Sequence, residues 1–187
     1  MKFIQLKHNW DIWAKEDPLW AICTDGGKRG NRWDREEFFQ TGNAEIVEVL
    51  DHIEGLGLDV NRGSSLDFGC GVGRLTQALA SRFDYCVGVD ISSEMVRLAT
   101  EFGGHLGNCS FVENSENDLK IFANGTFDFI YCSRVLQHME PADMVGYLAE
   151  FLRTLRQNGL LVFQLPSRQI GAKHIAKKIL PISAINL

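Results

Sequence analysis

The order of secondary structure after residue 63 constrains the fold more than any other feature of the chain. Helical patterns lie at Gly73–Ser81, Ser93–Glu101 and Pro141–Gln157. Short apolar runs predict strands at Ser64–Phe68, Tyr85–Asp90, Cys109–Glu113, Phe127–Ser133 and Leu160–Leu165. Strands that alternate with helices form parallel βαβ units, so we expect an α/β fold with a doubly wound, mostly parallel sheet in three α/β/α layers. All strand carboxyl ends then share one edge, where the functional site is expected.

Two further helix boundaries are marked in the sequence. Pro141 occupies a first-turn position, and Asn158 and Gly159 are expected to end the helix that Pro141 begins. An amphipathic stretch at Glu36–Leu56 has its apolar residues on one face and is expected to cover one side of the sheet.

The first 60 residues are expected to form a helical cap or lid, followed by the sheet domain at residues 61–187. All four tryptophans lie before residue 36, and Trp10 and Trp13 are spaced for one helical face. These rings either cover the expected site as a lid or close the open end of the sheet.

Composition excludes several classes of function. The chain has 187 residues, a formal net charge of −5 and a pI near 5.5, which argues against nucleic acid as a partner. Five cysteines are scattered without a CxxC pair or a histidine cluster, so we expect neither a metal site nor a disulfide framework. The N-terminal residues contain no signal-like apolar segment, and no long apolar run predicts stable membrane insertion. We therefore expect a cytoplasmic protein.

The first strand runs into a glycine-rich turn, "LDFGCGVGRL", in which Asp67 precedes three glycines spaced GxGxG. A dinucleotide fingerprint requires a small residue where this chain has Arg74, and the GK[ST] of a phosphate-binding P-loop is absent. Backbone N–H groups in such a turn suit a carboxylate, and an acid such as Asp67 suits an amine. The turn therefore favours a ligand with an amino-acid group over one with a pyrophosphate.

This turn resembles the first motif of class I S-adenosylmethionine-dependent methyltransferases, in particular the type 11/12-like domains, which have a Rossmann-like fold. The resemblance extends in order over residues 64–166, through "FDFIYCSRVLQHME" and "FLRTLRQNGLLVFQLP". It implies S-adenosylmethionine as cofactor and S-adenosylhomocysteine as product. In the first motif, the resemblance places these residues at the amino-acid half of the cofactor: Asp67, Gly69, Cys70, Gly71 and Gly73.

The later motifs supply the rest of the implied cofactor site. Asp90 ends the second strand, where an acid can accept both ribose hydroxyls, although nicotinamide-dependent enzymes share this device. The family usually has an acid at the adenine edge after the third strand, whereas this chain has Asn114 and Ser115, which are also ordinary turn residues. The remaining implied cofactor residues are Ile91 and Met95 after the second strand, and Cys132 and Ser133 after the fourth.

Methyl transfer from a sulfonium is an in-line displacement, which depends mainly on positioning and on exclusion of water. An acceptor hydroxyl also needs a base, and His138 is the best candidate, with Glu140 a lesser one. His138 is equally suited to capping the turn before Pro141. Arg74 and Arg134 either bind a carboxylate, of the cofactor or of an acidic acceptor, or have structural roles.

The sequence therefore predicts a methyltransferase that acts on a small-molecule or glycan-like acceptor. The NPPY-type tetrapeptide of base-modifying relatives is absent, since "CSRVLQ" occupies its place. Two alternatives remain: a non-catalytic, regulatory domain of a larger protein that binds S-adenosylmethionine, and a nicotinamide-dependent oxidoreductase. The residues after Pro166 are too few for the helix and antiparallel strand pair that usually complete the family fold. We expect either a truncated domain that belongs to a longer protein with other domains, or a shortened fold with a more open acceptor side.

Overall fold

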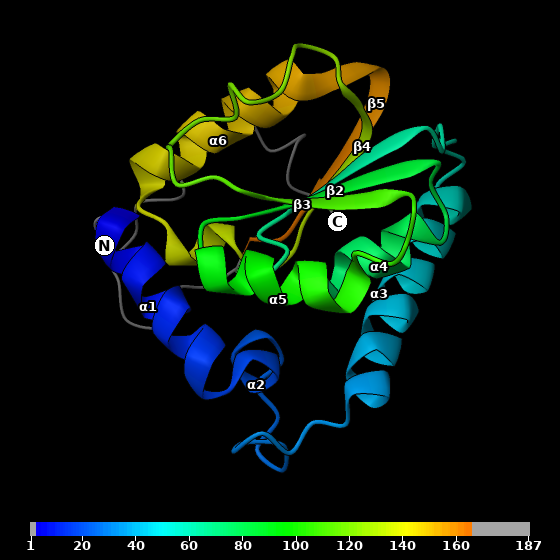
Figure 1. Ribbon diagram of the computed structural model, residues 1–187. Coiled ribbons are helices and arrows are strands. Elements are labelled where there is room, and N and C mark those ends of the chain that lie inside the picture. Colours follow the sequence, from blue (N-terminus) through cyan, green and yellow to red (C-terminus); the bar gives the residue numbers. More distant parts are fainter. Residues whose placement is uncertain (1–2, 166–187) are drawn as a thin grey trace.

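The computed structural model describes residues 3–165, and within this range the chain forms a five-stranded parallel sheet. The strand order is β3-β2-β1-β4-β5 (Figure 1). The strands are β1 (Ser64–Phe68), β2 (Tyr85–Asp90), β3 (Cys109–Glu113), β4 (Phe127–Cys132) and β5 (Leu155–Phe163). The helices are α1 (Phe3–Glu16), α2 (Pro18–Ile22), α3 (Arg35–Gly55), α4 (Arg74–Ala80), α5 (Ser93–Gly103) and α6 (Pro141–Thr154), with a 3₁₀ helix at Leu136–His138.

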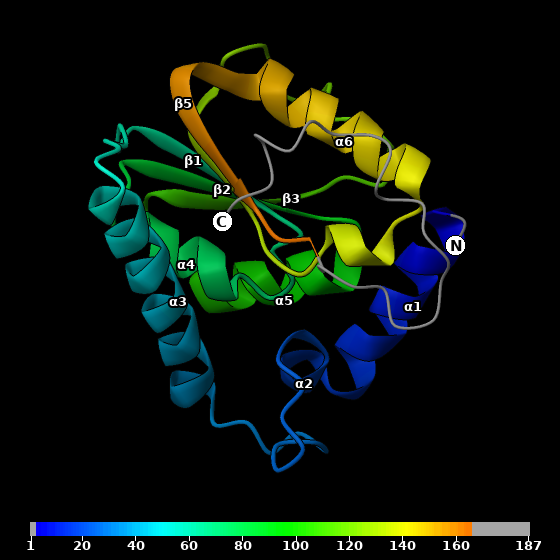
Figure 2. The same ribbon diagram turned by 180° about the vertical axis from the view of Figure 1, so that it is seen from behind.

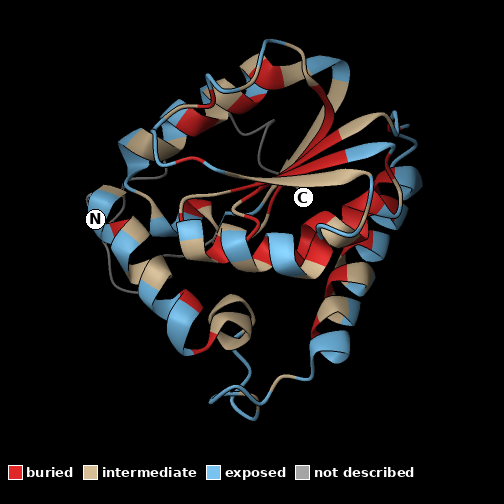
Figure 3. Cartoon of the chain, viewed as in Figure 1, coloured by how far each residue is buried: buried red, intermediate tan, exposed pale blue. Residues whose placement is uncertain are grey.

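Helices cover both faces of the sheet, as the α/β pattern predicts. Figures 1 and 2 show α6 on one face and α3, α4 and α5 on the other. Figure 3 shows buried residues in the central strands and on the inward sides of the helices, whereas the edge strands β3 and β5 are intermediate or exposed. The three-layer, doubly wound parallel fold is therefore confirmed for the described residues.

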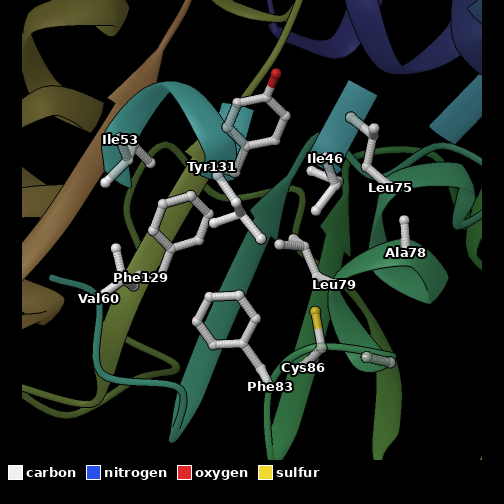
Figure 4. Packing of buried hydrophobic residues seen from close by; sticks show 12 residues of the cluster. Ile46, Ile53, Val60, Leu75, Ala78, Leu79, Phe83, Cys86, Phe129 and Tyr131 are labelled. Carbon is white, nitrogen blue, oxygen red and sulfur yellow. The ribbon is translucent and has the colours of Figure 1, made fainter. Parts of the chain in front are cut away.

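One hydrophobic cluster joins the amphipathic helix α3 to the sheet. Ile46 and Ile53 of α3 pack with Leu79 of α4 and Phe129 and Tyr131 of β4 (Figure 4). At Gly42, a side chain would lie 2.5 Å from the carbonyl oxygen of Arg74, so α3 approaches the start of α4 closely. This contact brings the middle of α3 next to the edge of the sheet where the site was expected.

Most predicted element boundaries agree with the structure, and the region around β5 differs. The helix that begins at Pro141 ends at Thr154, not at Gln157, and β5 begins at Leu155. The N–H groups of Gly125 and Thr126 bind the last carbonyl oxygens of α6, at distances of 3.0 and 2.7 Å, which anchors the helix end beside β4. The prediction that Asn158 and Gly159 end the helix was wrong.

Those two residues lie instead in an irregularity of β5. Phe127 of β4 pairs with Leu155, whereas Phe129 pairs with Leu160, so β5 has more residues than β4 over the same span. Asn158 has a φ of 64°, a conformation that asparagine tolerates. The predicted strand at Leu160–Leu165 is therefore the second half of a longer strand that ends at Phe163.

No helix among the described residues is both long enough and apolar enough to cross a membrane. The expectation of missing final strands falls on residues after 165, outside the described range.

Candidate functional site

A cavity of about 250 Å³ opens at the carboxyl edge of the sheet. It lies between the segments that follow β1 and β4, adjacent strands from which the chain leaves in opposite directions. Such a switch point is the usual ligand site of an open α/β sheet. Helices α1 and α2 form the outer wall, through residues that include Leu6, Trp10 and Ile22.

Helix α1 is fastened across the strand ends by polar and aromatic contacts. Lys7 donates to the carbonyl oxygen of Ile91 at 3.0 Å and pairs with Glu113 at 2.6 Å. The Trp10 ring meets the His138 ring edge-on, with 5.7 Å between centroids. Trp10 lines the cavity, whereas Trp13 packs against Trp20.

The three glycines of the turn are each required for a different reason. All have positive φ: 78° at Gly69, 53° at Gly71 and 83° at Gly73. A Cβ at Gly69 would collide with the side chain of Val135 after β4. A Cβ at Gly71 would lie 2.5 Å from Cδ1 of Ile22, the end of α2. Glycine at these two positions therefore lets Val135 and Ile22, which both line the cavity, pack closely against the turn.

Gly73 has a packing role. A Cβ there would lie 2.7 Å from the Phe111 ring of β3, so this glycine lets the start of α4 pack against the sheet. It does not line the cavity, although the sequence placed it at the cofactor.

Four N–H groups of the turn already have acceptors within the protein. Those of Gly69 and Cys70 donate to the Val89 carbonyl oxygen at 2.7 and 3.0 Å. Gly71 donates to Oδ2 of Asp90 at 2.8 Å, and Gly73 donates to the Cys70 carbonyl oxygen. The carboxylate of a ligand in the cavity would therefore need hydrogen-bond donors other than these four N–H groups. The sequence had predicted that the N–H groups of the turn themselves would bind it.

Asp67 lies in β1 beneath the turn and is 1% exposed. Its Oδ2 accepts a hydrogen bond of 2.7 Å from the Thr76 hydroxyl. Burial raises the pKa of Asp67 to about 7, against the opposing effects of the Thr76 hydrogen bond and the Arg74 charge. The structure thus places Asp67 behind the cavity wall, where it is partly protonated at neutral pH.

Asp90 lines the cavity at the end of β2. Its Oδ1 accepts from the Ser92 N–H at 2.9 Å, and its Oδ2 accepts from Gly71. Burial raises the pKa of Asp90, and these two hydrogen bonds offset part of that effect. Ser92 caps α5 through its own hydroxyl, which accepts from the Met95 N–H. Asp90 is therefore not needed as the N-cap of α5, and each of its carboxylate oxygens has a second lone pair that can accept a hydrogen bond from a ligand.

Among the other predicted residues, Asn114 lines the cavity and organises the loop after β3. Its amide donates to the Asp118 carbonyl oxygen at 2.6 Å. Ser115 is exposed and lies outside the cavity, and the Met95 and Cys132 side chains are fully buried in hydrophobic clusters. The structure therefore brings together eight of the thirteen predicted site residues: Gly69, Cys70, Gly71, Asp90, Ile91, Asn114, Ser133 and His138.

His138 reaches the cavity from the 3₁₀ helix that follows β4. Its Nε2 lies 3.2 Å from the Gln137 side-chain amide. Burial lowers the pKa of His138, so the imidazole is mainly neutral at pH 7. A neutral imidazole in this position is able to accept a proton.

Glu45 of α3 is a site residue that sequence reasoning missed. Its Oε1 accepts hydrogen bonds from the hydroxyls of Tyr131 (3.0 Å) and Ser133 (2.9 Å). Its Oε2 pairs with Arg74 at 2.6 Å and with Arg134 at 3.2 Å. Burial by itself would raise the pKa of Glu45, but the charge and hydrogen bond of Arg74, together with Arg134 and Ser133, hold the pKa below its usual value. Glu45 is thus ionised at neutral pH.

The sequence contained one signal for this contact, the glycine at position 42 inside an amphipathic helix. A glycine there indicates a close approach, but it does not say which element approaches.

The model of one protein family, described as a methyltransferase domain, matches residues 66–163 of the chain. The chain belongs to this methyltransferase family. The match covers more than half of the chain and includes the end of β1, the glycine turn, Asp90 and the segment after β4. The family resemblance inferred from the ordered motifs is therefore confirmed.

Curated relatives are methyltransferases of several kinds. A trans-aconitate 2-methyltransferase of Deinococcus radiodurans is 28% identical over 142 residues, which is 76% of this chain and 52% of the relative. A phosphoethanolamine N-methyltransferase of Zea mays is 26% identical over 160 residues, 84% of this chain and 29% of the relative. The chain thus spans about half, or less, of the length of these relatives.

Solved structures show the same fold. Haemonchus contortus phosphoethanolamine N-methyltransferase 1, solved with phosphoethanolamine and S-adenosylhomocysteine, has a TM-score of 0.67 to this chain at 16% identity. The similarity covers 86% of this chain and 31% of that one. Because the identity is low, this likeness establishes the fold alone.

Proposed function

We propose that this methyltransferase binds S-adenosylmethionine in the cavity at the carboxyl edge and transfers the methyl group to a small-molecule acceptor. The observation that carries the proposal is the pairing of Gly71 with Asp90 at the switch point of the sheet, inside the segment that matches the family. The relatives act, by their names, on small molecules such as trans-aconitate and phosphoethanolamine. The Haemonchus contortus relative was solved with S-adenosylhomocysteine, the product of this cofactor.

The residues present fit such a cofactor. Gly69 and Gly71 let the cavity-lining residues Val135 and Ile22 pack directly against the turn, and Asp90 retains acceptor capacity for a ribose. Asn114 lies where the adenine edge is expected, at the end of β3. Apolar walls from Leu6, Ile22 and other residues suit a site from which water is excluded. Asp67, Gly73, Met95, Ser115 and Cys132 would support the site from outside the cavity.

When bound, S-adenosylmethionine supplies an electrophilic methyl group on a sulfonium. The protein residues orient the acceptor in line with that methyl group and exclude water, because helix α1 covers the strand ends. If the acceptor group is a hydroxyl, His138 serves as the general base and takes its proton onto the neutral imidazole. Trp10, edge-on to His138, limits the rotation of that ring.

The proposal also covers the cellular location of the protein and its partners. All five cysteines lie within the described residues and none forms a disulfide, which supports a reducing, cytoplasmic location. The acidic chain and its small-molecule relatives support no role for nucleic acid. The greater length of the relatives supports the presence of other domains. A purely regulatory role is not favoured, because the named relatives are enzymes.

Thermal stabilisation tests the proposal directly. S-adenosylhomocysteine at 100 times its dissociation constant should add about 2.7 kcal/mol, or roughly 5 to 11 °C in the midpoint of unfolding. Asp90→Ala should remove most of this shift, whereas Asp51→Ala, at an exposed position of α3, should retain it. Stabilisation by NAD without stabilisation by S-adenosylhomocysteine would refute the proposal. Release of S-adenosylhomocysteine from S-adenosylmethionine during an acceptor screen then measures catalysis.

A further inference from the structure

Beside the segment that follows β4, two guanidinium groups pair with one carboxylate. Arg74 and Arg134 both line the cavity, and their common partner is Glu45 of α3. Arg74 is 3% exposed and holds Glu45 at 2.6 Å, whereas Arg134 meets the same oxygen at 3.2 Å. The two arginines therefore share one counter-ion.

The two other acids near the cavity accept hydrogen bonds from groups other than these arginines. Asp90 lies across the cavity after β2 and already accepts two backbone hydrogen bonds. Asp67 is buried beneath the turn, and burial raises its pKa to about 7, which leaves much of it neutral. A cation in a partly enclosed, mainly apolar cavity is costly unless an anion pairs with it.

Arg134 is the arginine that is able to meet a ligand. Its side chain is 46% exposed and lines the cavity, in contrast to the buried Arg74. Its Nη1 lies 3.6 Å from the sulfur of Cys23, a weak acceptor, so the guanidinium retains donor capacity for a stronger one. The backbone of Arg134 has a φ of 62°, which is unfavourable for arginine and typical of residues held in place at functional sites.

We propose that Arg134 binds a carboxylate or phosphate group of an acidic acceptor, with Glu45 as the residue that positions the guanidinium. This inference rests on the proposed function and narrows the acceptor to small anions. A guanidinium presents parallel N–H groups that match two oxygens of a carboxylate or phosphate. The cofactor also carries a carboxylate, so the experiment has to separate the two sources of the anion.

The test uses Arg134→Asn, because asparagine tolerates the left-handed backbone, and Arg134→Lys, which keeps the charge without the paired donors. Arg97→Gln is the matched control, since Arg97 is exposed on α5 and pairs with Glu94 and Glu101 of the same helix. Calorimetric titrations of the full chain, saturated with S-adenosylhomocysteine, measure the affinity for citrate and inorganic phosphate. Triethyl citrate serves as the uncharged probe.

We expect at least one anion, and not the ester, to bind the unaltered chain, and Arg134→Asn to weaken that binding about tenfold or more. The anion affinity of Arg134→Lys should lie between those of Arg134→Asn and the unaltered chain. The affinity of Arg97→Gln should equal that of the unaltered chain. If neither anion binds, or if both Arg134 variants bind as the unaltered chain does, the inference is wrong.

A second pair of titrations examines the cofactor as the source. S-adenosylhomocysteine carries the amino-acid carboxylate and 5′-methylthioadenosine lacks it. If Arg134→Asn weakens the binding of S-adenosylhomocysteine but not that of 5′-methylthioadenosine, and the anions still bind as before, Arg134 binds the cofactor carboxylate and the inference is wrong. Failure of the unaltered chain to bind S-adenosylhomocysteine would instead refute the proposed function.

Discussion

Replacing Asp67 with asparagine should stabilise the protein, and the gain should grow with pH. The carboxyl group is 1% exposed, and burial raises its pKa from 3.8 to about 7. Below pH 3.8 both the folded and the unfolded chain hold the proton. Between pH 3.8 and 7 the unfolded chain loses it while the folded chain keeps it, so ionisation favours unfolding. Above pH 7 both forms are ionised and the effect is constant.

The pKa difference sets the size of the effect. A difference of about three in pKa corresponds to about 4 kcal/mol of lost stability at pH 8. At pH 5 the loss is only about 1.5 kcal/mol, because this pH lies only about one unit above the pKa of the carboxyl group in the unfolded chain. Asparagine does not ionise and keeps an oxygen that accepts from Thr76, so the Asp67→Asn variant escapes the pH-dependent loss.

Urea denaturation at pH 5 and pH 8, at equal ionic strength, measures the prediction. The difference in unfolding free energy between Asp67→Asn and the unaltered chain should widen by about 2.5 kcal/mol from pH 5 to pH 8. Asp51→Asn, on the exposed side of α3, is the matched control. A difference that stays constant or narrows with rising pH would show that Asp67 is ionised in the folded protein, and the reasoning from burial would fail.

Three other outcomes follow from the same geometry. Gly69→Ala should lower the unfolding free energy by about 1–3 kcal/mol, because the added methyl group collides with Val135 after β4. Gly146→Ala in α6 is the control without such a loss, because its methyl group enters open space. Thermal melts with and without S-adenosylhomocysteine compare the two variants. Glu45→Gln should cost about 3 kcal/mol in urea denaturation, because it leaves the buried Arg74 without a charged partner, and a loss below about 1 kcal/mol would contradict this. Methylation of a hydroxyl acceptor should slow as the pH falls through the lowered pKa of His138 and the imidazole gains a proton, and His138→Gln should remove that dependence; its persistence in the variant would exclude His138 as the base.

The strands were predictable because their apolar runs are short and bounded by turn residues. The bounds of β1, β2 and β3 coincide with the prediction. The start of β5 was not predictable, since the end of α6 depends on hydrogen bonds from Gly125 and Thr126, which are distant in sequence. Local residue preferences do not contain such contacts.

Residues at the strand ends could also be gathered into one site from the sequence, because parallel strands direct their carboxyl ends to a common edge. That argument found Gly71, Asp90 and His138, all of which line the cavity. It did not distinguish side chains that face the cavity from those beneath it. Asp67 and Met95 follow the same motif order, yet both are buried.

Motif order and periodicity thus established the fold, the family and the edge that holds the site. The charges around the site depend on tertiary structure. Glu45 comes from a helix outside the motifs, and its contacts with Arg74 and Arg134 arise only when α3 packs beside β4. The pKa of Asp67 likewise depends on the depth at which folding buries it. Burial and charge pairing are properties of atoms brought together from distant parts of the chain, so no local pattern of residues specifies them.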